Sequence, residues 1–126
     1  MNPIQLTLAV ALSALAAGQA TAAPKPAKTC FSARNVSNFA TVDEQTINIR
    51  VGVRDVYRLD LFGTCPDIGW QNQIAIKSRG SAFICSPLDA TIVSEGPFGR
   101  AQRCEVRGMH KLTPEEIAVL PSREKP

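Results

Sequence analysis

Hydrophobic and polar residues alternate with a period of two through most of the chain between Cys30 and Leu112. The segment TINIRV, residues 46–51, puts Ile, Ile and Val on one face of a strand and Thr, Asn and Arg on the other. Because side chains alternate across a strand, this pattern predicts antiparallel strands with one buried face. The strands predicted in this way cover residues 39–42, 46–51, 56–62, 73–78, 82–85, 91–94 and 103–109.

The segments between these strands are rich in turn-forming residues. Each of them contains Gly, Pro, Asp or Ser. The segments are VDEQ, VGVRD, GTCPDIG, SRGS, SPLD and EGPFG. We therefore expect a mainly β fold of six or seven short strands, with a small antiparallel sheet curled into a sandwich or a partial barrel.

One short helix is predicted near the end of the chain, at residues 113–120. Thr113 and Glu116 have the spacing of a capping box, Pro114 suits a first helical turn, and Pro121 ends the pattern. Such a short helix needs tertiary contacts, so we expect Ile117 and Leu120 to pack on the sheet. The remaining segment, 121–126, is predicted to be a solvated tail.

The beginning of the chain resembles a secretory signal. Residues 1–22 carry no charged side chain, residues 6–17 are mostly apolar, and Ala20-Thr21-Ala22 matches an A-x-A cleavage pattern. The apolar run is shorter than the roughly 20 residues that a membrane-spanning helix needs. We expect cleavage after Ala22, a flexible lead-in at 23–29 and a single domain at 30–120. The protein is then periplasmic or secreted, with no transmembrane segment after cleavage.

Size and charge narrow the possible functions. Removal of 22 of the 126 residues leaves 104, enough for one domain with a modest core. The formal net charge of +3 is too small to indicate a nucleic-acid-binding protein. The chain has only one Trp, one Tyr and five Phe on which bases could stack, so we expect no nucleic acid as a partner.

The four cysteines, Cys30, Cys65, Cys85 and Cys104, are far apart in the sequence, and none forms a close pair. Zinc sites and thiol–disulfide exchange sites normally use such pairs, so we expect no metal and no cofactor. An even number of cysteines in an exported chain indicates two structural disulfides. Three connectivities are possible, and we expect the sequential one, Cys30–Cys65 and Cys85–Cys104.

Several segments resemble a known family. Together they resemble a family of small exported proteobacterial proteins of unknown function. The segments are CFSARNVSNF, VDEQTINIRVGVRDVYRLDLFGTCPDI, SRGSAFIC, GRAQRCEV and LTPEEIAVL. The resemblance covers roughly residues 30–120. It implies location in the cell envelope and one domain, but it carries no activity and no site residues.

Catalytic signals are weak. His110 is the only histidine, and it is interpreted as a residue at the surface or at a strand end rather than as the base of a nucleophile. Asp55, Asp60 and Asp67 alternate with basic residues near turns and are interpreted as solvated charges. Arg79-Gly80 is predicted to form a hairpin turn.

Basic residues recur on the polar phase of the predicted strands. If the strands are neighbours, these residues form a cationic stripe that Asp60 and Glu105 interrupt, able to contact an anionic envelope component or an acidic protein. The alternative is a solvated sheet face with cross-strand ion pairs. The residues of the stripe are Arg50, Arg58, Lys77, Arg79, Arg103 and Arg107.

Trp70 is the remaining candidate, in the loop after Cys65. We expect it to anchor this loop over the core, and the alternative is a binding residue.

These observations favour a non-catalytic, exported envelope protein that binds an anionic ligand or a protein partner. Two alternatives stay open. One is a small periplasmic hydrolase with a dispersed site, and the other is an exported enzyme inhibitor. A cavity that gathers His110 with a carboxylate or a serine would favour the enzyme.

Overall fold

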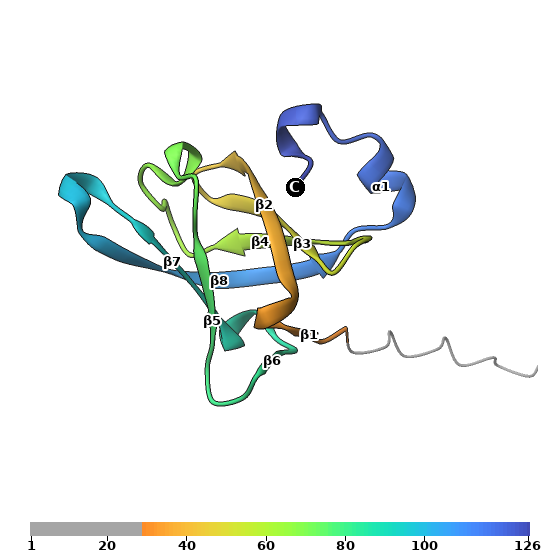
Figure 1. Ribbon diagram of the computed structural model, residues 1–126, viewed down its shortest axis with the longest axis horizontal. Helices are drawn as coiled ribbons and strands as arrows, with labels where there is room; N and C mark the ends of the chain where they lie inside the picture. The colour runs from red at the N-terminus through yellow and green to blue at the C-terminus, as the bar shows by residue number, and fades with distance from the viewer. Residues whose placement is uncertain (1–28) are drawn as a thin grey trace, which may run out of the picture.

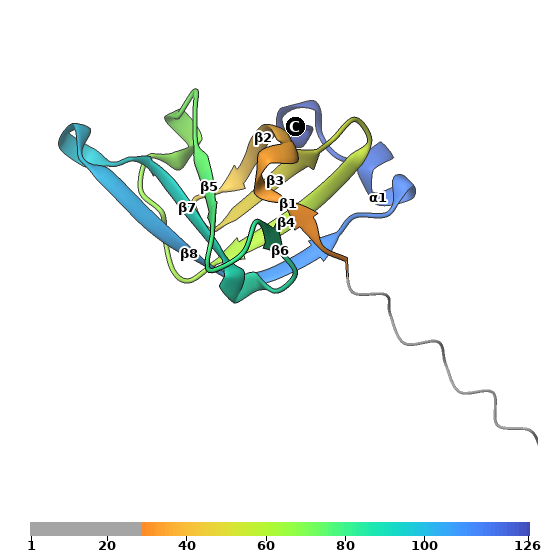
Figure 2. The ribbon, with the colours of Figure 1, turned by 60° about the horizontal axis from the view of Figure 1, so that its bottom comes forward.

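The main structural unit is a curled, six-stranded antiparallel sheet with the strand order β2-β3-β4-β8-β7-β5. The computed structural model describes residues 29–126, and the expected signal sequence and residues 23–28 lie outside this range. Figure 1 shows the sheet with the C-terminal segment beside it, and the turned view shows a trough with β5 and β7 on one side and β2 and β3 on the other (Figure 2). The sheet is a half-barrel, so the expected mainly β, curled fold is confirmed.

All seven predicted strands are present, with one further two-residue strand. The strands are β1 (Phe31–Ser32), β2 (Val36–Asp43), β3 (Thr46–Val51), β4 (Asp55–Leu61), β5 (Ala75–Ser78), β6 (Phe83–Ile84), β7 (Ala90–Glu95) and β8 (Ala101–Lys111). Five short 3-10 turns connect or follow them: η1 (Ala33–Asn35), η2 (Ile68–Trp70), η3 (Pro87–Asp89), η4 (Pro97–Gly99) and η5 (Ser122–Glu124). The one α-helix in the part of the chain that the structure describes, α1 (Pro114–Ala118), is shorter than the segment expected for it.

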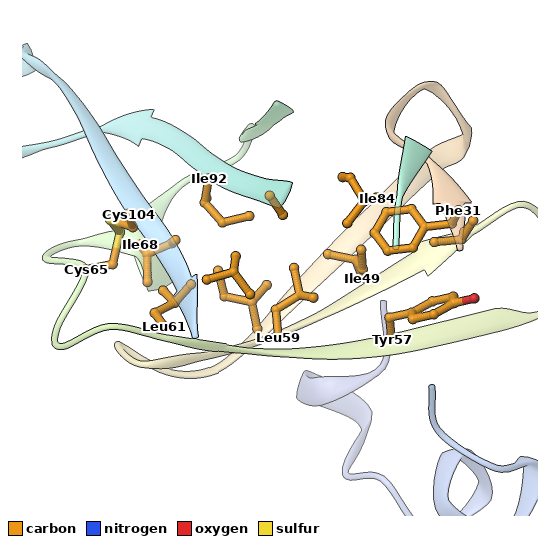
Figure 3. Close-up of a cluster of buried hydrophobic side chains, with 14 residues drawn as sticks. Phe31, Ile49, Tyr57, Leu59, Leu61, Cys65, Ile68, Ile84, Ile92 and Cys104 are labelled. Atoms are coloured by element: carbon orange, nitrogen blue, oxygen red, sulfur yellow. A yellow bond between two sulfur atoms is a disulfide. The ribbon is translucent and has the colours of Figure 1, made fainter. Parts of the chain in front are cut away.

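The hydrophobic core fills the inner face of the trough. Residues from β3, β4 and β8 form its floor, and Phe31 and Ile84, from the separate β1–β6 pair, pack on the opposite side (Figure 3). The rings of Phe31 and Tyr57 lie 4.7 Å apart, in the range of favourable aromatic pairs. The core therefore joins the two sheets into one body.

A β-bulge changes the phase of β8 in its middle. Leu61 pairs with Val106 and Asp60 pairs with Gly108, so Arg107 has no direct partner on β4. As a result Val106 faces the core and Met109, three residues later, packs against it too. An extra residue in one strand shifts the inward and outward positions by one, which a strict period of two does not anticipate.

The C-terminal segment covers the outer face of β3 and β4, on the side of the sheet away from the core (Figure 3). Asn48 and Val56, which belong to the face predicted to be polar, are fully buried. Asn48 Nδ2 donates a hydrogen bond to the main-chain oxygen of Glu124 at 2.9 Å, and Pro126 is buried. The prediction of a solvated tail is therefore wrong, because main-chain groups of the tail pair with polar side chains of the sheet.

The helix is capped as the sequence indicates. Thr113 Oγ1 accepts a hydrogen bond from the main-chain N–H of Glu116, and Glu116 Oε1 accepts one from the N–H of Thr113. Both Ile117 and Leu120 are half-buried, while Leu112, just before the cap, is 3% exposed. Leu112 N–H donates to the Val56 oxygen at 2.8 Å, so Leu112 supplies the buried contact that fastens this segment to β4.

The two disulfides are Cys30–Cys85 and Cys65–Cys104, so the presence of two bridges is confirmed but the sequential connectivity is wrong. Pairing of Phe31 with Ile84 places Cys30 beside Cys85. Pairing of Leu61 with Val106 brings the loop after β4 close to Cys104. Strand neighbours thus decide which cysteines meet. Within residues 29–126, no helix is long and apolar enough to cross a membrane.

Candidate functional site

The six basic residues expected to form one stripe lie on two different parts of the curled sheet. Arg50 and Arg58 are on β3 and β4, on the outer face that the C-terminal segment covers. Lys77, Arg79, Arg103 and Arg107 lie on or beside β5 and β8, in the other half of the sheet. We call these four residues the basic face. The structure therefore does not bring all six side chains together.

Arg50 and Arg58 are engaged in contacts within the protein. Arg50 Nε donates to the main-chain oxygen of Pro126 at 2.8 Å, and its Nη1 donates to the oxygen of Val53 at 3.0 Å. Arg58 Nε donates to Asn48 Oδ1 at 3.0 Å. Both arginines are half-buried. Their donors are thus used to hold the C-terminal segment and the outer face of the sheet together.

Arg79 occupies the bend between β5 and β6. These strands lie in different sheets and do not pair, so the predicted hairpin turn is wrong. Gly80 has a φ of +77°, a left-handed conformation that glycine adopts without steric cost. Arg79 Nη2 lies 2.5 Å from Glu105 Oε2, which also accepts a hydrogen bond from Thr91 Oγ1 at 3.0 Å. Because both ion-pair side chains are well exposed, the pair contributes little to stability. It does hold Arg79 over the outer face.

Lys77, Arg103 and Arg107 are exposed, and their side chains make no hydrogen bond or ion pair within residues 29–126. Lys77 and Glu105 are both register partners of Thr91, so they share one face with Arg103, two residues along β8. Arg107 lies further along β8, at the bulge. Glu105 is the acidic residue among them, and its carboxylate is already paired with Arg79. Asp60, opposite Gly108 on β4, is a second acidic residue at the edge of this face beside Arg107. The face therefore keeps a net positive charge.

Trp70 does not anchor its loop, because its side chain is 86% exposed. Ile68, two residues earlier in η2, is fully buried and serves as the anchor. The disulfide at buried Cys65 and a hydrogen bond from the N–H of Trp70 to the Asp67 oxygen at 3.0 Å fix the rest of the loop. The expectation of a buried tryptophan is therefore wrong, and the alternative of a binding residue remains.

Two cavities adjoin the segment that follows Trp70. The larger, of about 810 Å³, lies between residues 70–75 and the end of the β7–β8 hairpin. The smaller, of about 360 Å³, lies between the two edge strands, where residues 72–76 face residues 33 and 36–39. The larger cavity includes Asn72, Gln73 and Glu95, none of which the sequence patterns singled out. The polar run QNQ beside the only tryptophan was the available signal.

His110 lies on the outer face of β8, opposite Arg58, and borders neither cavity. Its imidazole makes no hydrogen bond to another residue in the described part of the chain. Nearby Glu116 belongs to the helix cap, where the main-chain N–H of Thr113 lowers the pKa of its carboxyl. His110 therefore lacks the partner serine or orienting carboxylate that nucleophilic catalysis requires.

The carboxylates singled out in the sequence are dispersed. Asp55 forms an ion pair with Lys111 at 3.4 Å, Asp60 lies opposite Gly108, and Asp67 precedes η2 with a φ of 59°. Within residues 29–126, no group of three or more His, Cys, Asp or Glu residues is arranged to hold a metal ion. These placements offer no paired carboxylates for acid–base chemistry.

Comparison with known proteins gives a family but no activity. No curated protein and no solved structure matches the chain. One family model matches residues 2–125, nearly the whole sequence. The chain therefore belongs to the Family of unknown function (DUF6491).

Proposed function

We propose that this protein is a non-catalytic, exported protein of the cell envelope that binds an anionic partner through its basic face. The observation that carries the proposal is the shared, outward placement of Lys77, Arg103 and Arg107, which have no acidic partner in residues 29–126. Exposed charges of one sign raise the local potential and attract ligands of the opposite sign. The bound partner is an anionic envelope component or an acidic protein surface.

Export is part of this proposal. Two disulfides support an oxidising compartment, and the apolar N-terminal segment with its Ala20-Thr21-Ala22 pattern supports cleavage after Ala22. The intact mass of the protein recovered from the producing cell tests this step. A mature chain beginning at Ala23 is the expected product, and a mass that still includes residue 1 would contradict it.

The binding experiment compares the mature, oxidised protein with two triple variants on sedimented envelope fragments. The first variant carries Lys77→Glu, Arg103→Glu and Arg107→Glu, which reverse three charges of the basic face. The second variant is the matched control. It carries Arg34→Glu, Arg54→Glu and Arg100→Glu, which change the net charge by the same amount at exposed positions elsewhere. We expect sedimentation to be lost with the first variant and retained with the second. Equal loss with both would show a general charge effect and would overturn the proposal.

An enzyme inhibitor remains the second candidate, and it would use the same kind of surface. Its discriminating property is a protein target. The anionic partner would then be an acidic patch on an exported enzyme in the envelope fragments rather than a lipid or a polymer. Envelope fragments treated with protease would lose binding in that case and would keep it if the partner is not a protein.

A further inference from the structure

The surroundings of Trp70 are those of a ligand site rather than of a structural loop. Tryptophan is normally largely buried, because its side chain removes much apolar area from water on folding. Here the indole is 86% exposed and lines an open cavity of about 810 Å³, within the range of roughly 300–1,000 Å³ typical of small-molecule sites. The protein therefore holds a large, flat, apolar surface in water beside a cavity that can accept a ligand.

The loop that carries the indole is held in place without a ligand. Ile68 is buried at its base, Cys65 is bonded to Cys104, and Gln71 Nε2 donates to the main-chain oxygen of Glu95 at 2.8 Å across the cavity. This last bond connects the two walls of the cavity, one after η2 and the other at the end of β7. A site fixed in this way loses little conformational entropy when a ligand binds.

The polar groups of the cavity are mainly carboxamides. Asn72 and Gln73 are exposed, and their side chains make no hydrogen bond within residues 29–126. Each carboxamide offers one acceptor oxygen and two N–H donors on one planar group. Neighbouring Glu95 adds acceptors only. Such a set pairs with a ligand that has many groups able both to donate and to accept, as hydroxyl groups do.

The charged and polar groups that line the cavity argue against anionic ligands and against wholly apolar ligands. Among residues 29–126, Glu95 is the only charged residue that lines the cavity, and neither Lys nor Arg lines it. An anionic ligand would lie next to a carboxylate without a compensating cation. A wholly apolar ligand would deprive the carboxamides of water without replacing their hydrogen bonds, which costs free energy. An uncharged, hydroxyl-rich ligand with one apolar face fits both constraints.

We propose that the Trp70 cavity binds a neutral oligosaccharide. A pyranose ring presents C–H groups on one face, which stack on the indole, and hydroxyl groups at its rim, which pair with Asn72, Gln73 and Glu95. The open form of the cavity lets a chain of sugars enter and leave at its ends. This site adjoins the basic face, since Ala75 and Val93 in its lining share a register row with Arg103, but no residue of the basic face lines it.

The single tryptophan makes the test direct, because all indole fluorescence of the mature chain comes from Trp70. The mature protein is titrated with three neutral probes: chitotetraose, maltohexaose and cellohexaose. We expect at least one of them to shift the emission to shorter wavelength with saturation, as the sugar excludes water from the indole. No response to any of the three at millimolar concentration would overturn the proposal.

Calorimetry with variants then locates the site. Trp70→Ala and the double variant Asn72→Ala, Gln73→Ala should each weaken binding by about tenfold or more, corresponding to roughly 1.4 kcal/mol. Phe83→Ala is the matched control: it removes an exposed aromatic ring that does not line the cavity, and it should bind normally. Undiminished affinity of Trp70→Ala, with an unchanged melting temperature, would contradict the assignment.

Two further measurements separate this inference from its competitors. Binding of an uncharged sugar should not change with the salt concentration or in the basic-face variant. A negative result for the sugar site can therefore be told apart from a negative result for the proposed function. Tetramethylammonium tests a cationic ligand held by the indole and Glu95, since cations bind aromatic faces. Tighter binding of that ion than of every sugar would overturn the oligosaccharide assignment.

Discussion

Arg58 and Asn48 lie directly opposite each other on β4 and β3, and Arg58 Nε donates a hydrogen bond to Asn48 Oδ1 at 3.0 Å. The same Asn48 side chain donates to the Glu124 oxygen at 2.9 Å. One fully buried amide therefore joins a strand, its neighbour and the end of the chain. This relationship fixes the Arg58 side chain against β3 through its Nε.

Replacement of Asn48 by Ala should reduce the free energy of unfolding by about 1–3 kcal/mol, because it leaves polar groups of Arg58 and Glu124 without their buried partner. Urea unfolding measures this change. Asn38→Ala is the matched control, since Asn38 is exposed on neighbouring β2, and it should change stability by no more than about 0.5 kcal/mol. Equal effects of the two substitutions would show that the C-terminal contact is unimportant.

The disulfide between Cys65 and Cys104 should be a strong contributor to stability. Chain-entropy estimates for loops of this size give on the order of 4 kcal/mol for the bridge, which spans 39 residues of sequence. The double variant Cys65→Ser, Cys104→Ser should therefore unfold at much lower urea concentration than the native protein. Peptide mapping without reduction checks the pairing, and a fragment that links Cys30 to Cys65 would contradict the fold.

Tyr57 should make stability decrease at high pH. Burial raises the pKa of its phenol, with nearby Lys111 opposing and Asp55 adding to the shift. The folded protein then keeps this proton at pH values where the unfolded chain has lost it. The contribution of Tyr57 is thus complete below about pH 10, the usual tyrosine pKa, and is lost as the pH rises further.

The measurement for this prediction is a spectrophotometric titration, which is specific because the chain has a single tyrosine. The folded protein should ionise at higher pH than the same protein in denaturant. Tyr57→Phe should remove the corresponding part of the pH dependence of unfolding. Identical titration curves for the folded and unfolded protein would refute the burial argument.

The strands and the helix cap were predictable because their signals are local. Alternation of residues along a strand, and the pair Thr113 and Glu116, need no knowledge of distant segments. The disulfide connectivity was not predictable in this way, because it depends on pairing between β1 and β6, each only two residues long. The bulge at Arg107 had one local signal, Gly108 inside the strand, which the alternation pattern did not use.

The candidate site was only partly predictable for the same reason. Alternation placed Lys77 and Arg103 on an outward face, where the structure has them. It also placed Arg50 and Arg58 outward, but the tail that covers them contributes main-chain oxygens, which no pattern of side chains reveals. The cavity at Trp70 arises where the segment before β5 leaves β7, a feature of three-dimensional arrangement alone.

The central claim, an anionic partner held by the basic face, is tested most directly by the salt dependence of binding to envelope fragments. Raising the salt from 0.1 M to 1 M shortens the Debye length from about 10 Å to about 3 Å and should release the mature protein. The variant with Lys77, Arg103 and Arg107 changed to Glu should fail to bind even at 0.1 M, while the charge-matched control binds and is released like the native protein. Binding that persists at 1 M salt, or that survives the basic-face substitutions, would contradict the account.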